Sequence, residues 1–154
     1  MKIYISGDHA GFKLKNRIRL FLVKKGYVVE DIGPFEYNSK DDYPDFVIPM
    51  AKEVAKDKNS RGIIIAGSGQ GEIIAANKIK GARAILYYGS KKPSEILKLS
   101  RAHNNSNILS LGARFLTERQ TKKAIEIWLK APFSNAIRHK RRLSKIEKYE
   151  NKRK

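Results

Sequence analysis

The feature that most constrains the fold is a continuous apolar run, Ile63 to Ala66, that leads directly into the glycine-rich loop 67–71. An apolar run without polar alternation is typical of a strand buried on both faces of a parallel sheet. Parallel strands need crossover connections, and these are usually helices. The rest of the chain should therefore alternate short strands with helices.

Short apolar segments and helical patterns do alternate along the chain, without a linker or a low-complexity stretch. Strands are expected at residues 3–5, 27–32, 63–66, 82–87 and 107–111. Helices are expected at about 12–25, 45–56, 73–76, 93–102 and 117–130, and from about 134 onward. The pattern predicts an α/β fold: a three-layer, doubly wound, Rossmann-like sheet of five parallel strands, with a C-terminal helix.

Length and composition limit the kinds of protein that this chain can be. Its 154 residues suit one domain, 1–154, with a basic helical tail at about 138–154. The absence of cysteine excludes disulfides, thiolate catalysis and cysteine-bound metal. No apolar stretch approaches the roughly 18 residues of a membrane span, and no signal peptide is present. We therefore expect a cytoplasmic protein without a membrane partner.

The formal net charge of +18 allows two interpretations. A basic surface can bind nucleic acid. Alternatively, it is a solvated surface that surrounds a site for a small anion. Only part of the positive charge is concentrated in one segment: residues 138–154 hold nine Lys or Arg against two Glu, and the rest is spread over the chain. No aromatic-rich basic motif or zinc pattern accompanies it, so nucleic acid is not expected as the main partner.

Polar and charged side chains follow the predicted strands. In doubly wound sheets, ligands bind beyond the carboxyl ends of the strands, so the loops there are the place to look for a site. Glycine accompanies polar groups in the loops 7–11, 67–72 and 112–114. We expect one rim of the sheet to collect five side chains: Asp8, His9, Glu72, His103 and Arg114.

The loop 67–71 joins a buried strand to a helix, and its N–H groups should surround an anion-binding hollow. It matches neither the Walker loop nor the Rossmann fingerprint. Glu72 follows it, and two roles are open: a cap that complements the helix dipole, or a base for proton abstraction beside a carbonyl. The helix N-terminus would lower the pKa of Glu72 and burial would raise it, and the sequence leaves this balance open.

Histidines and arginines supply further candidates. His9, beside Asp8 in a glycine turn, is predicted to be functional, His103 is undecided, and His139 is expected at the surface. Arg138 and Arg142 are four residues apart, so they share a helix face and could bind one phosphate, or could simply be solvated. The residues expected on the packed side of that helix are Ile137, Leu143 and Ile146.

Five stretches of the chain resemble the family that contains ribose-5-phosphate isomerase B and the galactose-6-phosphate isomerase subunits. They occur in the family's order over nearly the whole chain, at residues 7–15, 42–44, 67–78, 101–105 and 112–114, and a further match spans 138–142. The resemblance implies an aldose–ketose isomerase that interconverts ribose 5-phosphate and ribulose 5-phosphate through an enediolate, without metal or cofactor. A six-carbon substrate, allose or galactose 6-phosphate, is the alternative.

The family resemblance also implies a homodimer whose active sites are built from both subunits, and it leaves open whether dimers pair into tetramers. One branch of the family uses a cysteine base at the position of Ala66, so this chain is similar to the branch whose base is a glutamate at the position of Glu72.

The remaining roles implied by the family concern the sugar and its phosphate. Ser68 and the amides of the loop, at Gly67, Gly69 and Gly71, would hold the developing oxyanion. His103 would help to open the furanose ring, while Asp8 and Asn104 would contact the sugar and Tyr43 would line the pocket. The phosphate would be held by four residues: His9, Arg114, Arg138 and Arg142.

Overall fold

Five strands form the centre of the fold, in a computed structural model that describes residues 1–152 of the chain. Each strand begins and ends within two residues of its predicted position. The strands are β1 Lys2–Gly7, β2 Val28–Asp31, β3 Arg61–Ala66, β4 Ala84–Tyr87 and β5 Ile108–Gly112.

Six helices alternate with the strands and begin or end at recognisable signals. They are α1 Phe12–Lys24, α2 Pro44–Lys56, α3 Gln70–Ala76, α4 Pro93–Asn104, α5 Glu118–Lys130 and α6 Ile137–Lys152. Gly26, with a φ of 84°, follows the end of α1 as a left-handed glycine should. Thr117 caps α5, because its side chain accepts a hydrogen bond from the Gln120 N–H at 3.3 Å. Among residues 1–152, no helix combines the length and the apolarity that crossing a membrane requires.

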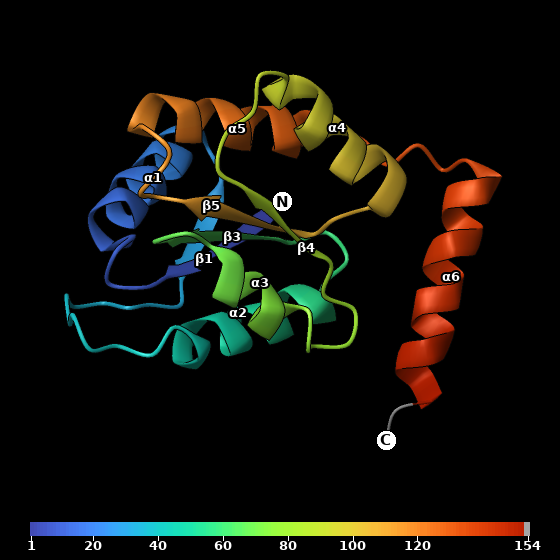
Figure 1. The fold of residues 1–154 in the computed structure, drawn as a ribbon, viewed down its shortest axis with the longest axis horizontal. Helices are drawn as coiled ribbons and strands as arrows, with labels where there is room; N and C mark the ends of the chain where they lie inside the picture. The colour runs from blue at the N-terminus through green and yellow to red at the C-terminus, as the bar shows by residue number, and fades with distance from the viewer. Residues whose placement is uncertain (153–154) are drawn as a thin grey trace.

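All strand pairs are parallel, in the order β2-β1-β3-β5-β4. Helices α1, α4 and α5 cover one face of the sheet, and α2 and α3 cover the other (Figure 1). Alternate residues of β3 enter the two cores: Ile63 and Ile65 pack on the first face, Ile64 and Ala66 on the second. Burial on both faces explains the continuous apolar run, and the predicted three-layer fold class is confirmed.

The strand order places a topological switch point between β1 and β3. The chain continues from β1 to β2 on one side, and from β3 toward β5 and β4 on the other. In sheets of this kind, ligands bind outside the carboxyl ends of the strands at such a switch point, which here is where β1 and β3 end.

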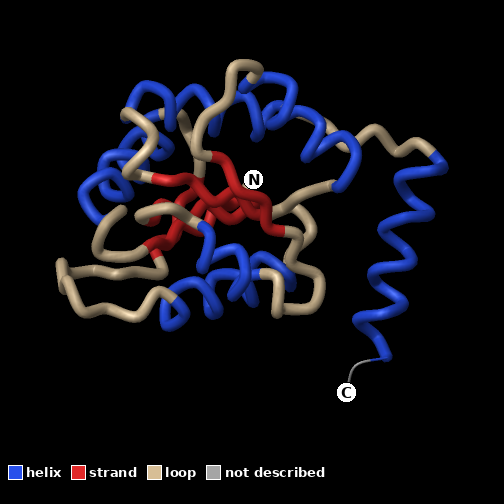
Figure 2. Tube along the Cα trace, in the orientation of Figure 1, coloured by secondary structure: helices blue, strands red, loops and turns tan. Residues whose placement is uncertain are grey.

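Helix α6 stands beside the layers rather than on either face of the sheet (Figures 1 and 2). Its far end is tied to the body by a hydrogen bond from the Gly81 N–H to Glu150 Oε2, at 3.2 Å. Of the three residues expected to pack, Leu143 is half-buried, but Ile137 is 84% exposed and Ile146 is 52% exposed. The expected packing is wrong for these two: Ile137 lies open on the helix, and Ile146 lines a cavity between the helix and the body.

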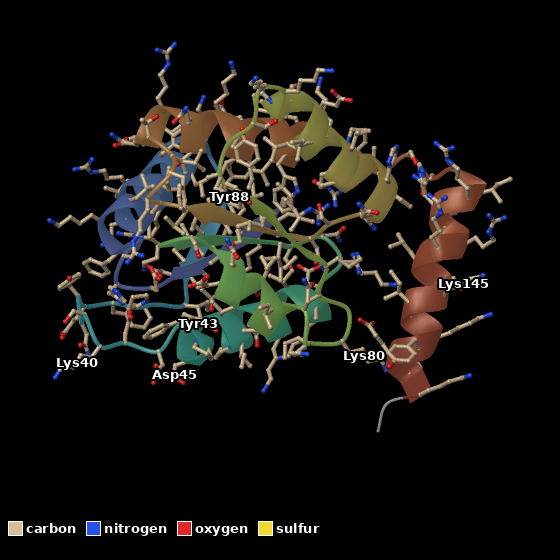
Figure 3. All side chains as sticks on the ribbon, in the orientation of Figure 1. Lys40, Tyr43, Asp45, Lys80, Tyr88 and Lys145 are labelled. Carbon is tan, nitrogen blue, oxygen red and sulfur yellow. The ribbon has the colours of Figure 1, made fainter. Side chains whose placement is uncertain are left out.

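A cavity of about 540 Å³ separates α6 from the body of the chain, and its wall includes Leu143 and Glu147 of the helix and Arg61 of β3. Lys80 lies on the side of the body that faces α6 (Figure 3). The predicted basic tail corresponds to this helix, except for residues 153 and 154, which lie outside the described residues.

Candidate active site

The loop after β3 turns sharply, and its backbone leaves several donors unused. Gly69 has a φ of 80°, and a Cβ there would lie 2.5 Å from Ser110 Oγ, so only glycine suits this position. Ser110 holds the turn by donating to the Gly69 carbonyl at 3.1 Å. Within residues 1–152, the N–H groups of Ser68, Gly69 and Gly71 have no hydrogen-bond partner. The loop therefore offers free donors at one place.

Asp8 ties the loop after β1 to the loop after β3. Its Oδ1 accepts from the Gly11 N–H at 2.7 Å, and its Oδ2 accepts from the Gly67 N–H at 3.2 Å. The two backbones touch here, because a Cβ on Gly11 would lie 1.8 Å from the carbonyl oxygen of Ile65. Glycine and a buried carboxylate thus hold the two sides of the switch point together.

Glu72 lies in the first turn of α3 and is 4% exposed. Burial is the main cause that raises its pKa, and the nearby carboxylates of Asp8 and Asp41 raise it further. A hydrogen bond from its own backbone N–H acts in the opposite direction and is outweighed. Burial therefore decides the balance that the sequence left open, and the result is a carboxylate that is more basic than usual.

The long loop between β2 and α2, residues 32–43, runs past the carboxyl ends of the strands (Figure 2). It carries Tyr43 to the start of α2 (Figure 3), where a Cβ on Gly71 would lie 2.7 Å from the Tyr43 hydroxyl. It also carries Asp41, whose Oδ1 is 2.6 Å from His9 Nδ1. Asp41 was not among the sequence candidates, because nothing local distinguishes it from the neighbouring acidic residue, Asp42.

Arg114 follows β5 and lies against the glycine loop. Its N–H donates to the Gly67 carbonyl at 3.1 Å, and its guanidinium carbon is 3.3 Å from the position of a Cβ on Gly67. The residues gathered here, the carboxyl-edge cluster, are Asp8, His9, Asp41, Tyr43, Gly67 to Glu72 and Arg114. In residues 1–152, no group of three or more His, Asp or Glu side chains is arranged to hold a metal ion.

His103 and Asn104 lie at the opposite edge of the sheet, so the expected place of His103 on the rim with Glu72 is wrong within one chain. They end α4, which carries the chain back from the carboxyl edge to the amino edge. The next residue, Asn105, accepts a hydrogen bond at 2.8 Å from Arg83 Nε, just before β4 begins. A five-residue strand such as β5 spans roughly 16 Å between the two edges.

The remaining candidates lie beside His103. Its ring centroid is 4.2 Å from that of His139 in α6. Arg138 and Arg142 occupy the first turns of that helix and are exposed. We call these residues the amino-edge cluster: His103, Asn104, Arg138, His139 and Arg142.

His139 is 3% exposed, which contradicts its expected place at the surface. Its Nδ1 is 2.7 Å from Ser134 Oγ, and its Nε2 accepts a hydrogen bond from Arg138. Burial lowers the pKa of His139, and the neighbouring His103, Arg138 and Arg142 lower it further. The histidine joins the start of α6 to the end of α4, a tertiary role that a basic sequence run does not reveal.

Arg101 fixes the turn that carries His103 and Asn104. It is 5% exposed and donates to the Ser106 carbonyl and, at 2.9 Å, to Asn105 Oδ1. Burial, followed by repulsion from two other arginines, lowers its pKa to about 10. Arg101 thus stabilises the turn that carries the amino-edge cluster, and it is buried rather than part of the exposed face of that cluster.

Comparison with known proteins identifies relatives over nearly the full length. A model of the family described as Ribose/Galactose Isomerase matches residues 3–146. Ribose-5-phosphate isomerase B of Mycolicibacterium paratuberculosis is 39% identical over 150 residues, which are 97% of this chain and 92% of that protein. A probable ribose-5-phosphate isomerase B of Mycoplasma genitalium is 41% identical and covers 96% of this chain and 95% of its own.

Solved structures agree with these relatives. Ribose-5-phosphate isomerase B from Mycoplasma genitalium with bound ribulose-5-phosphate has a TM-score of 0.91 and 39% identity, over 98% of this chain and 97% of that one. The enzyme from Clostridium thermocellum has a TM-score of 0.89 and 42% identity, over 100% of both chains. The switch point, its glycine loop and these full-length matches lead to one conclusion: the chain belongs to the ribose/galactose isomerase family.

Proposed function

We propose that this protein is a ribose-5-phosphate isomerase, which interconverts ribose 5-phosphate and ribulose 5-phosphate through an enediolate in the non-oxidative pentose phosphate pathway. The observation that carries the proposal is the buried Glu72, whose pKa is raised, beside a loop with free N–H donors. A basic carboxylate next to preorganised donors is the equipment that proton transfer beside a carbonyl needs. The name and the bound ketose of the Mycoplasma genitalium relative agree with it.

Glu72 acts as the base. Its carboxylate takes the proton from C2 of the open-chain aldose, and the electron pair of the broken C–H bond forms the enediolate. The hydroxyl proton then moves from O2 to O1, and return of the proton from Glu72 to C1 gives the ketose. Ala66, at the end of β3, has no group that could take this role. The raised pKa strengthens Glu72 as a base.

The glycine loop stabilises the oxyanion that develops as the proton leaves. The free N–H groups of Ser68, Gly69 and Gly71 are the donors, and the Ser68 hydroxyl is a fourth. Gly67 brings the loop close to Arg114 and lets the substrate approach the backbone. Such donors favour the enediolate over the bound sugar because the charge on oxygen is larger in the transition state.

We propose that the phosphate is bound by His9 and Arg114 of one chain and by Arg138 and Arg142 of a second chain. The separation of the carboxyl-edge and amino-edge clusters supports this, since the length of β5 keeps them apart within one chain. A homodimer with shared active sites would bring them together. The exposed face of α6, including Ile137, would then contact the partner.

The other sugar contacts follow the same division. From the partner, His103 helps to open the furanose ring, and Asn104 contacts the sugar. From the chain that supplies Glu72, Asp8 orients a sugar hydroxyl, and Tyr43, which packs over Gly71, lines the pocket. Asp8 already accepts two backbone hydrogen bonds, so its orientation is fixed before the substrate arrives.

The direct test is an isomerisation assay with ribose 5-phosphate in excess chelator, compared with allose 6-phosphate and galactose 6-phosphate. We expect turnover of the pentose phosphate without added metal, and a higher kcat/KM than for either hexose phosphate. A higher kcat/KM for a hexose phosphate would assign the six-carbon alternative, which the family also includes. No turnover of any of the three would refute the proposal.

We also propose that residues 1–154 act as one cytoplasmic isomerase domain. The basic segment from about Arg138 serves the phosphate of the substrate and not a nucleic acid. The absence of cysteine and the single alternation of strands and helices support this view. Sedimentation of the protein as a dimer that does not bind duplex DNA at physiological salt would agree with it.

A further inference from the structure

Asp41 is a buried carboxylate in the carboxyl-edge cluster that the mechanism above does not use. Its side chain is 4% exposed, and its Oδ1 lies 2.6 Å from His9 Nδ1. Its Oδ2 is also buried and has no hydrogen-bond partner in residues 1–152. Burying a carboxylate costs free energy unless it is paired or hydrogen-bonded. A carboxylate held in this way, with one histidine as its side-chain partner, therefore calls for a functional reason.

The loop that carries Asp41 is anchored by other residues. At its start, the fully buried Lys15 donates to both carboxylate oxygens of Asp31, at 2.6 and 2.7 Å. Asp31 Oδ1 also accepts from the Gly33 N–H at 2.9 Å. Near its end, the Asp41 N–H donates to the Asn38 carbonyl at 3.1 Å. The fold thus places Asp41 independently of His9, so the carboxylate can orient the imidazole.

The pair also determines which ring nitrogen of His9 carries hydrogen. An ionised carboxylate only accepts hydrogen bonds, so Nδ1 of His9 must be the donor to Asp41. Nε2 is then the nitrogen left for a ligand, and it has no hydrogen bond in residues 1–152. A carboxylate that touched a phosphate directly would repel it, whereas an imidazolium between the two can donate from Nδ1 to the carboxylate and from Nε2 to the phosphate.

We propose that Asp41 is a positioning residue for phosphate recognition: it holds the His9 ring in one orientation by accepting from Nδ1, so that the Nε2–H of the protonated ring donates to the phosphoryl group of the substrate. The identity of the substrate rests on the proposed function, whereas the His9–Asp41 pair does not. Supporting groups of this kind fix the tautomer and the direction of a histidine in many sites.

The first test uses Asp41→Ala and Asp41→Asn in the full protein at pH 8. In Asp41→Ala, we expect the KM for ribose 5-phosphate and the inhibition constant of inorganic phosphate to rise together by about tenfold. Asp41→Asn keeps an acceptor for Nδ1, so its rise should be smaller. In both variants kcat should stay within about threefold, because Asp41 does not touch the reacting carbons. Glu36→Gln, an exposed carboxylate of the same loop, is the matched control and should change neither constant.

The second test needs no isomerase activity. In ¹⁵N NMR spectra of the wild type with inorganic phosphate bound, His9 should carry hydrogen on both Nδ1 and Nε2. In Asp41→Ala, phosphate should bind more weakly and protonate the ring to a smaller extent. In a His9→Asn background, Asp41→Asn should not weaken phosphate binding further. If wild-type protein lacks isomerase activity but His9 shows this behaviour, the proposed function fails and this inference stands. Unchanged phosphate inhibition in Asp41→Ala, or a fall in kcat alone, would overturn it.

Discussion

Arg138 donates a hydrogen bond from Nε to Nε2 of His139 at 3.1 Å, although both side chains are bases. A guanidinium has no acceptor, so this nitrogen of His139 cannot carry hydrogen. The imidazole is therefore neutral, with its hydrogen on Nδ1, facing Ser134 Oγ. The contact that begins α6 depends on a histidine that resists protonation, as its lowered pKa also indicates.

The stability of the protein should therefore depend on the ionisation of His139. Its folded pKa lies below the ordinary value of 6.5, so below pH 6.5 the unfolded chain binds the proton more readily than the folded chain does. The contribution of this residue to stability is complete above pH 6.5, and it is lost as the pH falls from that value through the lower pKa of the folded protein. Urea unfolding at pH 7.5 and at pH 5.5 should show a smaller loss in His139→Gln than in the wild type. Equal losses in the two proteins would contradict the neutral state of His139.

Glu72→Gln should abolish most of the isomerase activity. An amide cannot accept the C2 proton, so kcat should fall about 10³-fold, within the range that a positioned acid or base supplies. The KM for ribose 5-phosphate should change little, since the phosphate contacts remain. Steady-state assays check this, with Glu95→Gln as a control, because Glu95 is an exposed glutamate at the start of α4. Turnover near the wild-type level would remove Glu72 from the role of base.

The pH profile of kcat/KM should show the raised pKa of Glu72. The carboxylate must be ionised to act, so activity should fall with decreasing pH, with the midpoint above the usual value of 4.5. Part of this rise comes from the charge of Asp41, so the midpoint should move to lower pH in Asp41→Asn. A midpoint that is identical in the two proteins would show that the two carboxylates are not coupled.

A shared active site predicts complementation between two inactive variants. Glu72→Gln lacks the base, and Arg142→Ala lacks a phosphate ligand that the partner supplies. When the two chains are mixed, unfolded and refolded, half of the dimers should contain both, and each of these has one intact site, which restores about a quarter of wild-type activity. If each chain builds its whole site alone, the mixture will stay as inactive as its components.

The loop after β1 lies so close to β3 that any side chain at Gly11 should destabilise the fold. A Cβ at this position would lie 1.8 Å from the Ile65 carbonyl oxygen, so Gly11→Ala should cost about 3 kcal/mol of unfolding free energy. Gly26→Ala is the comparison, because a Cβ there meets nothing within 4 Å and only the positive φ is strained. It should cost about 1 kcal/mol. Denaturant midpoints check this: the midpoint of Gly11→Ala should lie below that of Gly26→Ala, because the steric clash costs more than the strained φ.

Much of the fold could be predicted because local patterns and tertiary burial agree. The run from Ile63 to Ala66 is apolar since both faces of β3 are covered. Gly26 and Thr117 mark helix ends by local chemistry alone, Gly26 through its left-handed backbone and Thr117 through its side-chain cap. Glu72 could be placed on the rim for the same reason: it follows the short loop 67–71, which leaves the carboxyl end of a strand whose identity was clear.

The rest depended on contacts between residues that are distant in sequence. His103 was expected on the rim, but it lies at the end of a crossover helix, and such a helix returns the chain to the opposite edge. Asp41 belongs to a loop without a pattern, and its partner is 32 residues away. Ile137 has the spacing of a packed residue, yet it is 84% exposed among the described residues.

The buried pair of Lys15 and Asp31 has a practical consequence for labelling experiments. Most lysines of this chain face solvent, whereas Lys15 is 0% exposed and its ammonium group is bound by a carboxylate. Amine-directed reagents should therefore modify the surface lysines of the native protein and spare this one. Acetylation of Lys15, measured by mass spectrometry, would then count only the molecules in which α1 has separated from the end of β2.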